Sequence, residues 1–287
     1  MLFGCQCWNV LLVLFGILTL AYAFNRRFRF VIRCVLLYAT IMVNTILSMA
    51  LCIPASFFGH ACTVTFATLK VLMRWTGINV ETRNFNEVFA KQQSPCVVIC
   101  NHQSAIDTVV MANAYPPRGT VMMKRSLAYV PIFNILAWVC NIIFIDRPGR
   151  DKKSNTKNLK AVQKCIDVMN KKNLKLWMFP EGTRNRPLDG MLPFKMGAFN
   201  IAVQAQMPIV PIVASSFKCF YSHPEQYFDS DGEIIIQVMD PIPTIGLSLE
   251  DVPSLAEEVR QKMLVVYDRI TKEVNEKMAL KREGKKQ

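Results

Sequence analysis

The sequence has few histidines and few of the signatures that assign basic proteins to common classes. Only three of its 287 residues are histidine, no Cys or His spacing is typical of a zinc site, and no nucleic-acid-binding module occurs. No internal repeat or low-complexity linker divides the chain. These absences argue against a zinc or nucleic-acid-binding protein, although the formal net charge is +13. A charge of this sign also suits anionic lipid or a phosphorylated substrate.

Charge is absent from two long runs near the N-terminus, residues 8–24 and 35–58. Each is close to the length of about 20 residues that crosses hydrocarbon as a helix. Hydrophobic residues make up 52% of the whole chain, so we predict two N-terminal membrane-anchoring helices. The arginines between the runs form a basic connector that the positive-inside rule places in the cytosol: Arg26, Arg27, Arg29 and Arg33.

The sequence leaves the depth of insertion open. If the connector is cytosolic and the second run spans fully, the rest of the chain is lumenal, whereas a helical hairpin in one leaflet would keep it in the cytosol. Asn44 and Pro54 in the second run suit partial insertion. A cleaved secretory signal ending at residues 21–23 is the weaker alternative, because no basic residue precedes the first run. The ten cysteines are scattered or lie in apolar runs, which predicts reduced thiols and favours the cytosolic side.

Short β-rich runs alternate with helical stretches after residue 60. This alternation predicts an α/β fold, a mixed sheet of about seven strands covered by helices on both faces. The predicted helices include 105–114, 158–170 and 197–206, and the predicted strands are 78–82, 96–100, 120–123, 142–145, 174–178, 209–213 and 233–239. We divide the chain into membrane-anchoring helices at 1–60 and a catalytic domain at 61–287.

The end of the chain has the pattern of an amphipathic helix. Ser254 and Glu257 predict a capping box at its start. An apolar stripe follows at helical spacing and is expected to pack on the sheet: Leu255, Val259, Met263, Val266, Ile270 and Val274. Residues 281–287 read as a solvated basic tail. A further apolar stretch, 127–145, is broken by proline and asparagine, so we predict a buried or interfacial helix followed by a strand rather than a third span.

His102 and Asp107 are the leading candidates for chemistry. An apolar strand runs directly into the turn that carries them, and ligand sites of α/β sheets form at the carboxyl ends of strands. The imidazole can take a proton from an attacking alcohol, and the carboxylate can fix its tautomer. Asp107 also reads as a capping partner of Ser104, which is the structural alternative. Acylation of Ser104 itself, or of Cys100, is less favoured because no nucleophile elbow surrounds Ser104 and Cys100 ends an apolar strand.

A second strand leads into residues 179–184, which form a candidate anion site. Gly182 lets the backbone approach a ligand, Thr183 adds a hydroxyl donor, and Arg184 can fork onto phosphate oxygens. Three more cations follow predicted strands and could bind a headgroup or coenzyme A phosphates, or could simply be solvated: Lys124, Arg125 and Arg147.

Segments 101–107, 143–147, 179–184 and 203–213 together resemble the four ordered motifs of the glycerolipid acyltransferase family. Segment 179–221 looks most like the 1-acylglycerol-3-phosphate acyltransferase branch of the animal alpha and beta type. The resemblance implies that His102 is the base and Asp107 its partner. It matches Arg147 to the second motif and Pro208 to the fourth, and it implies that four residues bind the acceptor phosphate: Glu181, Gly182, Thr183 and Arg184.

This resemblance implies an acyl-CoA-dependent enzyme that acylates the sn-2 hydroxyl of lysophosphatidic acid to form phosphatidic acid, for phospholipid and triacylglycerol biosynthesis. It implies the endoplasmic reticulum membrane, acyl-CoA as co-substrate, no further cofactor and no metal. Backbone amides near Ser104 are candidates to stabilise the thioester oxyanion. The alternatives are acylation of glycerol 3-phosphate or another lysophospholipid, or a non-catalytic protein that binds membrane lipid.

Overall fold

A seven-stranded sheet forms the centre of the molecule in the computed structural model, which describes residues 16, 19–56, 61–124, 128–129, 137, 140, 142–145 and 154–284. The strand order is β1-β9-β6-β2-β5-β3-β4. The strands are β1 Asn79–Arg83, β2 Cys96–Cys100, β3 Gly119–Lys124, β4 Ile143–Ile145, β5 Lys175–Met178, β6 Ile209–Ala214 and β9 Glu233–Val238. The predicted mixed α/β sheet is confirmed, with every predicted strand found within two residues of its expected ends.

Neighbouring strands run parallel except for the β6 and β9 pair. Strand β2 lies between β5 and β6, and all five of its residues are buried, as expected for a central parallel strand. Strands β2, β3, β5 and β6 share one direction. The loops that follow them therefore all leave from the carboxyl ends of the strands, on one side of the sheet.

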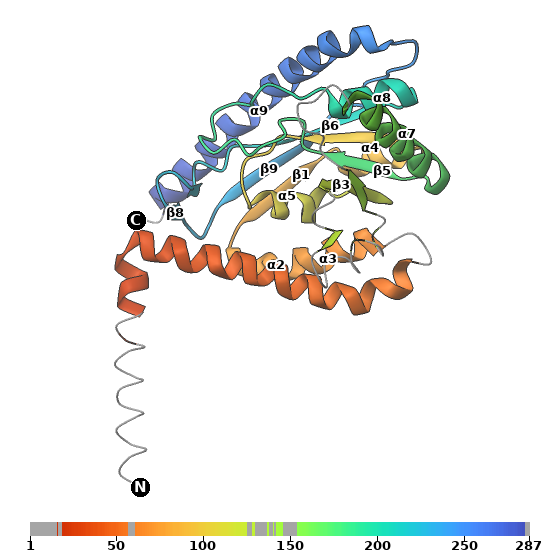
Figure 1. The fold of residues 1–287 in the computed structure, drawn as a ribbon. Helices are drawn as coiled ribbons and strands as arrows, with labels where there is room; N and C mark the ends of the chain where they lie inside the picture. The colour runs from red at the N-terminus through yellow and green to blue at the C-terminus, as the bar shows by residue number, and fades with distance from the viewer. Residues whose placement is uncertain are drawn as a thin grey trace.

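Helices cover both faces of this sheet (Figure 1). Val97 and Ile99 of β2 pack against one group, α7 Ser154–Lys172, α8 Gly197–Ala205 and α9 Val252–Gly284. Val98 packs on the opposite face, with α3 Ala61–Leu72, α4 Phe85–Lys91 and α5 Asp107–Ala114. The alternating side chains of one strand thus reach two separate hydrophobic layers.

Helix α9 begins before the predicted capping box. The short 3₁₀ helix η3, Leu249–Asp251, precedes it, and Ser248 and Asp251 form a capping box there. Ser254 donates to the carbonyl of Asp251 inside the first turn, so the predicted cap at Ser254 and Glu257 is wrong. The apolar stripe packs on the sheet as expected, although Val266 is only half-buried.

The basic tail is also helical at its start. Helix α9 continues to Gly284, where Lys281 pairs with Glu233 and Arg282 donates to the carbonyl of Cys219. Residues 285–287 lie outside the described part of the chain.

The predicted basic connector is the beginning of a helix, which corrects the boundary between the two N-terminal runs. Helix α2, Arg26–Ser56, includes all four arginines, because arginine is a good helix former and neither glycine nor proline occurs between residues 26 and 53. By length and composition, α2 could cross a membrane over Arg26–Cys52. The first predicted run, 8–24, lies outside the described residues except for residues 16 and 19–24, which are helical. The expected two-helix anchor is therefore supported in part.

Helix α2 lies beside α3 beneath the sheet (Figure 1). One face of α2 is buried against the domain, and the opposite face exposes apolar side chains such as Val35, Met42 and Ile46. Most of the predicted helix within 127–145 lies outside the described residues, whereas its strand is present as β4. The eight cysteines that the structure describes are free thiols, and Cys5 and Cys7 lie outside it.

Candidate active site

The loop between β2 and α5 is tied to the neighbouring strand β6 by two buried amide side chains. Asn101 donates to the carbonyl of Ala214 at 2.9 Å and accepts from its N–H at 2.8 Å, so its side chain continues the strand pairing beyond the end of β2. Gln103 donates to the carbonyl of Ser215 at 2.9 Å and accepts from the N–H of Phe217 at 3.3 Å. These bonds fix the backbone on both sides of His102.

His102 Nδ1 lies 2.7 Å from Asp107 Oδ2. The same oxygen accepts from the N–H groups of Gln103 at 2.8 Å and Ser104 at 3.0 Å. One carboxylate therefore orients the imidazole and closes the turn before α5, so the two alternatives considered for Asp107 occur together. The N–H groups of Gln103 and Ser104 are thus occupied by Asp107, and the predicted role of the other backbone amides near Ser104 as oxyanion donors stays a prediction.

Burial governs the electrostatics of this pair. Asp107 is 3% exposed, and its burial raises the pKa of the carboxyl above its usual range, while the hydrogen bond with His102 opposes this shift. The His102 side chain is 20% exposed. Among the described residues, Nε2 of this ring has no hydrogen-bond partner in the protein. The ring is thus anchored at one nitrogen and open at the other.

The segment after β5 lies next to this ring, as the parallel pairing of β2 and β5 requires. The Phe179 ring stacks on the His102 imidazole, with 4.1 Å between ring centroids and 21° between planes. Gly182 has φ +69°, in the left-handed region that glycine tolerates best, and a Cβ there would lie 3.2 Å from Lys195 Cγ. Thr183 and Arg184 follow with exposed side chains. The turn therefore presents a hydroxyl and a guanidinium to solvent.

Glu181 has a different environment from its neighbours. Its side chain is buried, with Oε1 accepting from the His102 N–H at 2.7 Å and Oε2 accepting from the Leu192 N–H at 3.0 Å. Both oxygens therefore face the protein, unlike the oxygens of a residue that contacts the acceptor phosphate. No local pattern predicts this contact, because Glu181 and His102 lie 79 residues apart in the sequence.

Three further residues reach the site without having been singled out: Phe179, Asn185 and Tyr221. The Asn185 N–H donates to the carbonyl of His102 at 2.8 Å. Burial raises the pKa of Tyr221 to about 12, while the Arg184 charge and a hydrogen bond with Ser104 act in the opposite direction. Only their positions could have drawn attention to two of them, since Phe179 lies within segment 179–184 and Asn185 directly follows it.

The remaining predicted cations are only partly described. Lys124 is the last residue of β3. It lies at the carboxyl end of its strand, on the same side of the sheet as the carboxyl end of β5, because the two strands run parallel. Arg125 and Arg147 lie outside the described residues, so their predicted contacts stay predictions.

The two alternative nucleophiles lack an activating environment in the described structure. Cys100 is fully buried, and burial raises the pKa of its thiol well above its usual value, which disfavours the reactive thiolate. The Ser104 hydroxyl accepts from the N–H of Ile106 at 3.0 Å, which is a turn contact.

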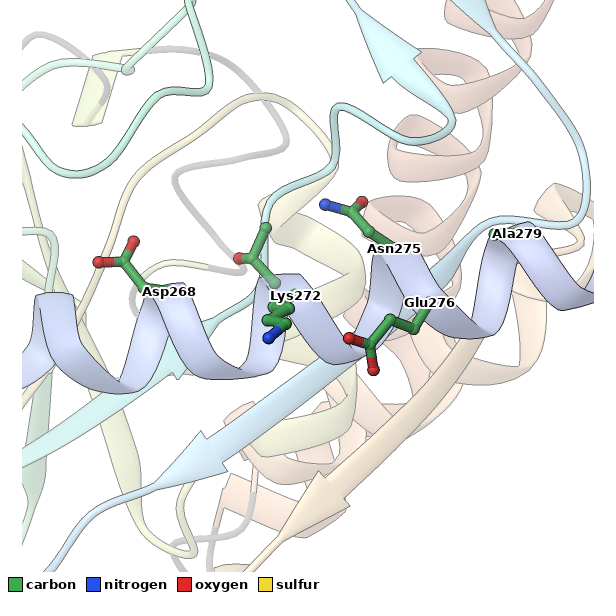
Figure 2. Close-up of a pocket in the computed structure, with 6 residues that line it drawn as sticks. Asp268, Lys272, Asn275, Glu276 and Ala279 are labelled. Carbon is green, nitrogen blue, oxygen red and sulfur yellow. The ribbon is translucent and has the colours of Figure 1, made fainter.

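A shallow hollow on the outer side of α9 is separate from these groups (Figure 2). Side chains of both charge signs line it: Asp268, Thr271, Lys272, Asn275, Glu276 and Ala279. None of them is a predicted site residue, and we assign the hollow no part in the chemistry.

Comparisons with known proteins agree with this arrangement. Residues 78–215 match the family model described as Acyltransferase. The Caenorhabditis elegans protein acl-2, named as a 1-acyl-sn-glycerol-3-phosphate acyltransferase, is 40% identical over 97% of this chain and 98% of its own length. Human 1-acyl-sn-glycerol-3-phosphate acyltransferase alpha is 40% identical over 68% of this chain and 66% of its own.

A solved structure has the same fold. The crystal structure of PlsC, the 1-acyl-sn-glycerophosphate (LPA) acyltransferase from Thermotoga maritima, covers 87% of this chain and 98% of its own, with a TM-score of 0.63 and 20% identity.

Proposed function

Since this chain belongs to the 1-acyl-sn-glycerol-3-phosphate acyltransferase family, we propose that it acylates the sn-2 hydroxyl of lysophosphatidic acid and forms phosphatidic acid. Acyl-CoA is the proposed donor and co-substrate, with no further cofactor and no metal. The observation that carries the chemistry is the His102 and Asp107 pair, whose imidazole is anchored at Nδ1 and open at Nε2.

The proposed reaction is direct transfer between the two substrates. With the Nδ1 proton donated to Asp107, Nε2 accepts the proton of the sn-2 hydroxyl as the hydroxyl oxygen attacks the thioester carbonyl. A carbon–oxygen bond forms, the carbon–sulfur bond breaks, and the imidazolium returns its proton to the departing thiolate of coenzyme A. Asp107 stabilises the imidazolium while it exists.

The acceptor phosphate is proposed to bind the exposed turn at residues 182–184. The Arg184 guanidinium and the Thr183 hydroxyl are exposed there, and the next residue, Asn185, donates its N–H to the His102 carbonyl. A guanidinium matches two phosphate oxygens at once. Lys124, Arg125 and Arg147 are proposed to add positive charge for this phosphate or for coenzyme A.

Helix α2 supports membrane association, since it is long, apolar and exposes one apolar face. We propose that this face lies in one leaflet of the endoplasmic reticulum membrane and that the catalytic domain faces the cytosol. The division into an anchor at 1–60 and a catalytic domain at 61–287 remains part of this proposal.

The test is the release of free CoA by the detergent-purified protein. Oleoyl-CoA is supplied with lysophosphatidic acid, glycerol 3-phosphate or lysophosphatidylcholine, and His102→Ala is measured in parallel. We expect turnover with lysophosphatidic acid that the substitution abolishes. Turnover confined to another acceptor would change the proposed substrate, and a folded protein without turnover on any acceptor would favour the lipid-binding alternative.

A further inference from the structure

The backbone of His102 is held on both sides by the segment that follows β5. Glu181 Oε1 accepts from its N–H at 2.7 Å, and the N–H of Asn185 donates to its carbonyl at 2.8 Å. The Phe179 ring lies against its imidazole. Residues 179–185 therefore contact the base through its ring and through both polar groups of its backbone.

The environment of Glu181 is costly for a carboxylate. The side chain is 1% exposed, and burial raises its pKa above the usual range. Among the described residues no lysine or arginine pairs with it, so two backbone amides are its compensation. A buried charge without a counter-charge destabilises a fold unless hydrogen bonds satisfy it. The second bond, to the Leu192 N–H, ties this carboxylate to a third segment of the chain.

We propose that Glu181 is a positioning residue for His102 and does not bind the acceptor phosphate. This inference rests on the proposed function and concerns the same site. Both carboxylate oxygens face protein amides, and a carboxylate turned toward the phosphate would repel it. Arg184 lies three residues further along the same turn, so the turn sets the place of the base relative to the cation that binds the phosphate.

The two roles give different kinetics. A residue that positions the base affects the chemical step, whereas a residue that binds the acceptor equally in ground and transition states affects KM. In Glu181→Gln, the amide oxygen can accept from only one of the two backbone N–H groups. The amide nitrogen is itself a donor, so the other N–H group is left without an acceptor. We expect kcat to fall roughly 10- to 100-fold, as misplaced catalytic groups cause, with KM for lysophosphatidic acid nearly unchanged. In Arg184→Gln, we expect chiefly a higher KM for this substrate.

Glu233→Gln is the matched control, because it makes the same chemical change at a residue that bonds Asn79 and Lys281 away from His102. Its kcat and KM should equal those of the wild type. Glu181→Asp keeps the charge but shortens the side chain, so its kcat should fall between those of Glu181→Gln and the wild type. Thermal unfolding of each variant verifies that the compared proteins are folded.

A readout without substrate separates this inference from the proposed function. The Cε1–H resonance of His102, assigned by comparison with His102→Ala, is expected to shift in Glu181→Gln and to stay in place in Glu233→Gln. A wild type without turnover would refute the proposed function and leave the resonance test standing. A raised KM with unchanged kcat in Glu181→Gln, or an unshifted resonance in that variant, would overturn the positioning role.

Discussion

One oxygen of Asp107 organises the catalytic turn. Three donors converge on Oδ2, from the His102 ring and from two backbone amides, while Oδ1 is buried without a partner among the described residues. An asparagine amide would offer these donors a neutral oxygen and would place a donor nitrogen at the second position, so it lacks the negative charge of the carboxylate. The turn and the imidazole therefore depend on the same ionised group.

Asp107→Asn should lower kcat by about 10³- to 10⁴-fold, because an amide cannot hold the imidazole in the right tautomer or stabilise its charged form. The KM for lysophosphatidic acid should change little, since Asp107 is buried behind the ring. Steady-state CoA release measures both constants. Asp167→Asn, at an exposed position of α7, is the control expected to behave as wild type. A loss of less than tenfold would leave Asp107 with only its role in the turn.

Phe179→Leu should lower kcat about 2- to 10-fold, since an aromatic stacking contact contributes roughly 0.5 to 1.5 kcal/mol beyond its buried area. The stacked ring limits rotation of the imidazole about its bond to Asp107. Phe194→Leu removes a comparable ring that stacks on Phe199 within the core. That control should lower the unfolding temperature while keeping kcat per folded molecule. Equal kcat values for the two variants would exclude a specific contribution from Phe179.

At the scale of elements, an ion-pair row fastens α9 to the edge strand β1. Arg83 contacts Glu273 through two nitrogens, at 2.5 and 2.8 Å, and Lys277 contacts Glu81 at 2.8 Å. Alternate residues of the strand thus face successive turns of the helix. The row fixes the position of α9 relative to β1, while the apolar stripe of α9 packs on the sheet.

Glu273→Gln should lower the unfolding temperature by about 2 °C at neutral pH, taking about 1 kcal/mol for a partly exposed pair. The hydrogen bond with Arg83 lowers the pKa of Glu273 to about 2. Its contribution is therefore present above the usual glutamate pKa of about 4.3 and is lost as pH falls toward 2.

The difference in unfolding temperature between the wild type and Glu273→Gln should therefore shrink as pH falls toward 2. Glu276→Gln is the control, since its side chain lies at the hollow in Figure 2 and no described residue pairs with it. A constant difference from pH 7 to pH 2 would contradict this account.

Local patterns predicted the strands and the His102 and Asp107 pair, whereas contacts between distant segments were not predictable. The run 96–100 is apolar on both faces, so its burial follows from composition alone, and five residues separate the base from its partner. The start of α9 was misplaced because Ser248 and Asp251 carry the same spacing as an ordinary cap. Glu181 resembled a phosphate ligand in sequence, since nothing near it predicts the distant His102 amide.

At the scale of the whole molecule, the two faces of α2 have different partners. On the domain side, Arg33 donates to the carbonyl of Thr76 and lies 4.5 Å from the ring centre of Phe228, and Asn44 donates to the carbonyl of Thr65 at 3.3 Å. The other face exposes apolar side chains. A helix that crossed the bilayer while keeping these contacts would carry α3 and the polar turns beside it into hydrocarbon, where unpaired polar groups cost several kcal/mol each.

We therefore predict that α2 does not cross the membrane and that the C-terminus faces the cytosol. A glycosylation acceptor added after Gln287 should stay unmodified when the full chain is inserted into endoplasmic reticulum microsomes. The same acceptor behind an added spanning segment is the positive control. Efficient glycosylation without that segment would contradict the predicted cytosolic C-terminus. If α2 were then the segment that spans, Arg33 and Asn44 would have to leave their partners in the domain. A cytosolic C-terminus would instead place His102 on the side of the membrane where the proposed acyl-CoA donor is supplied.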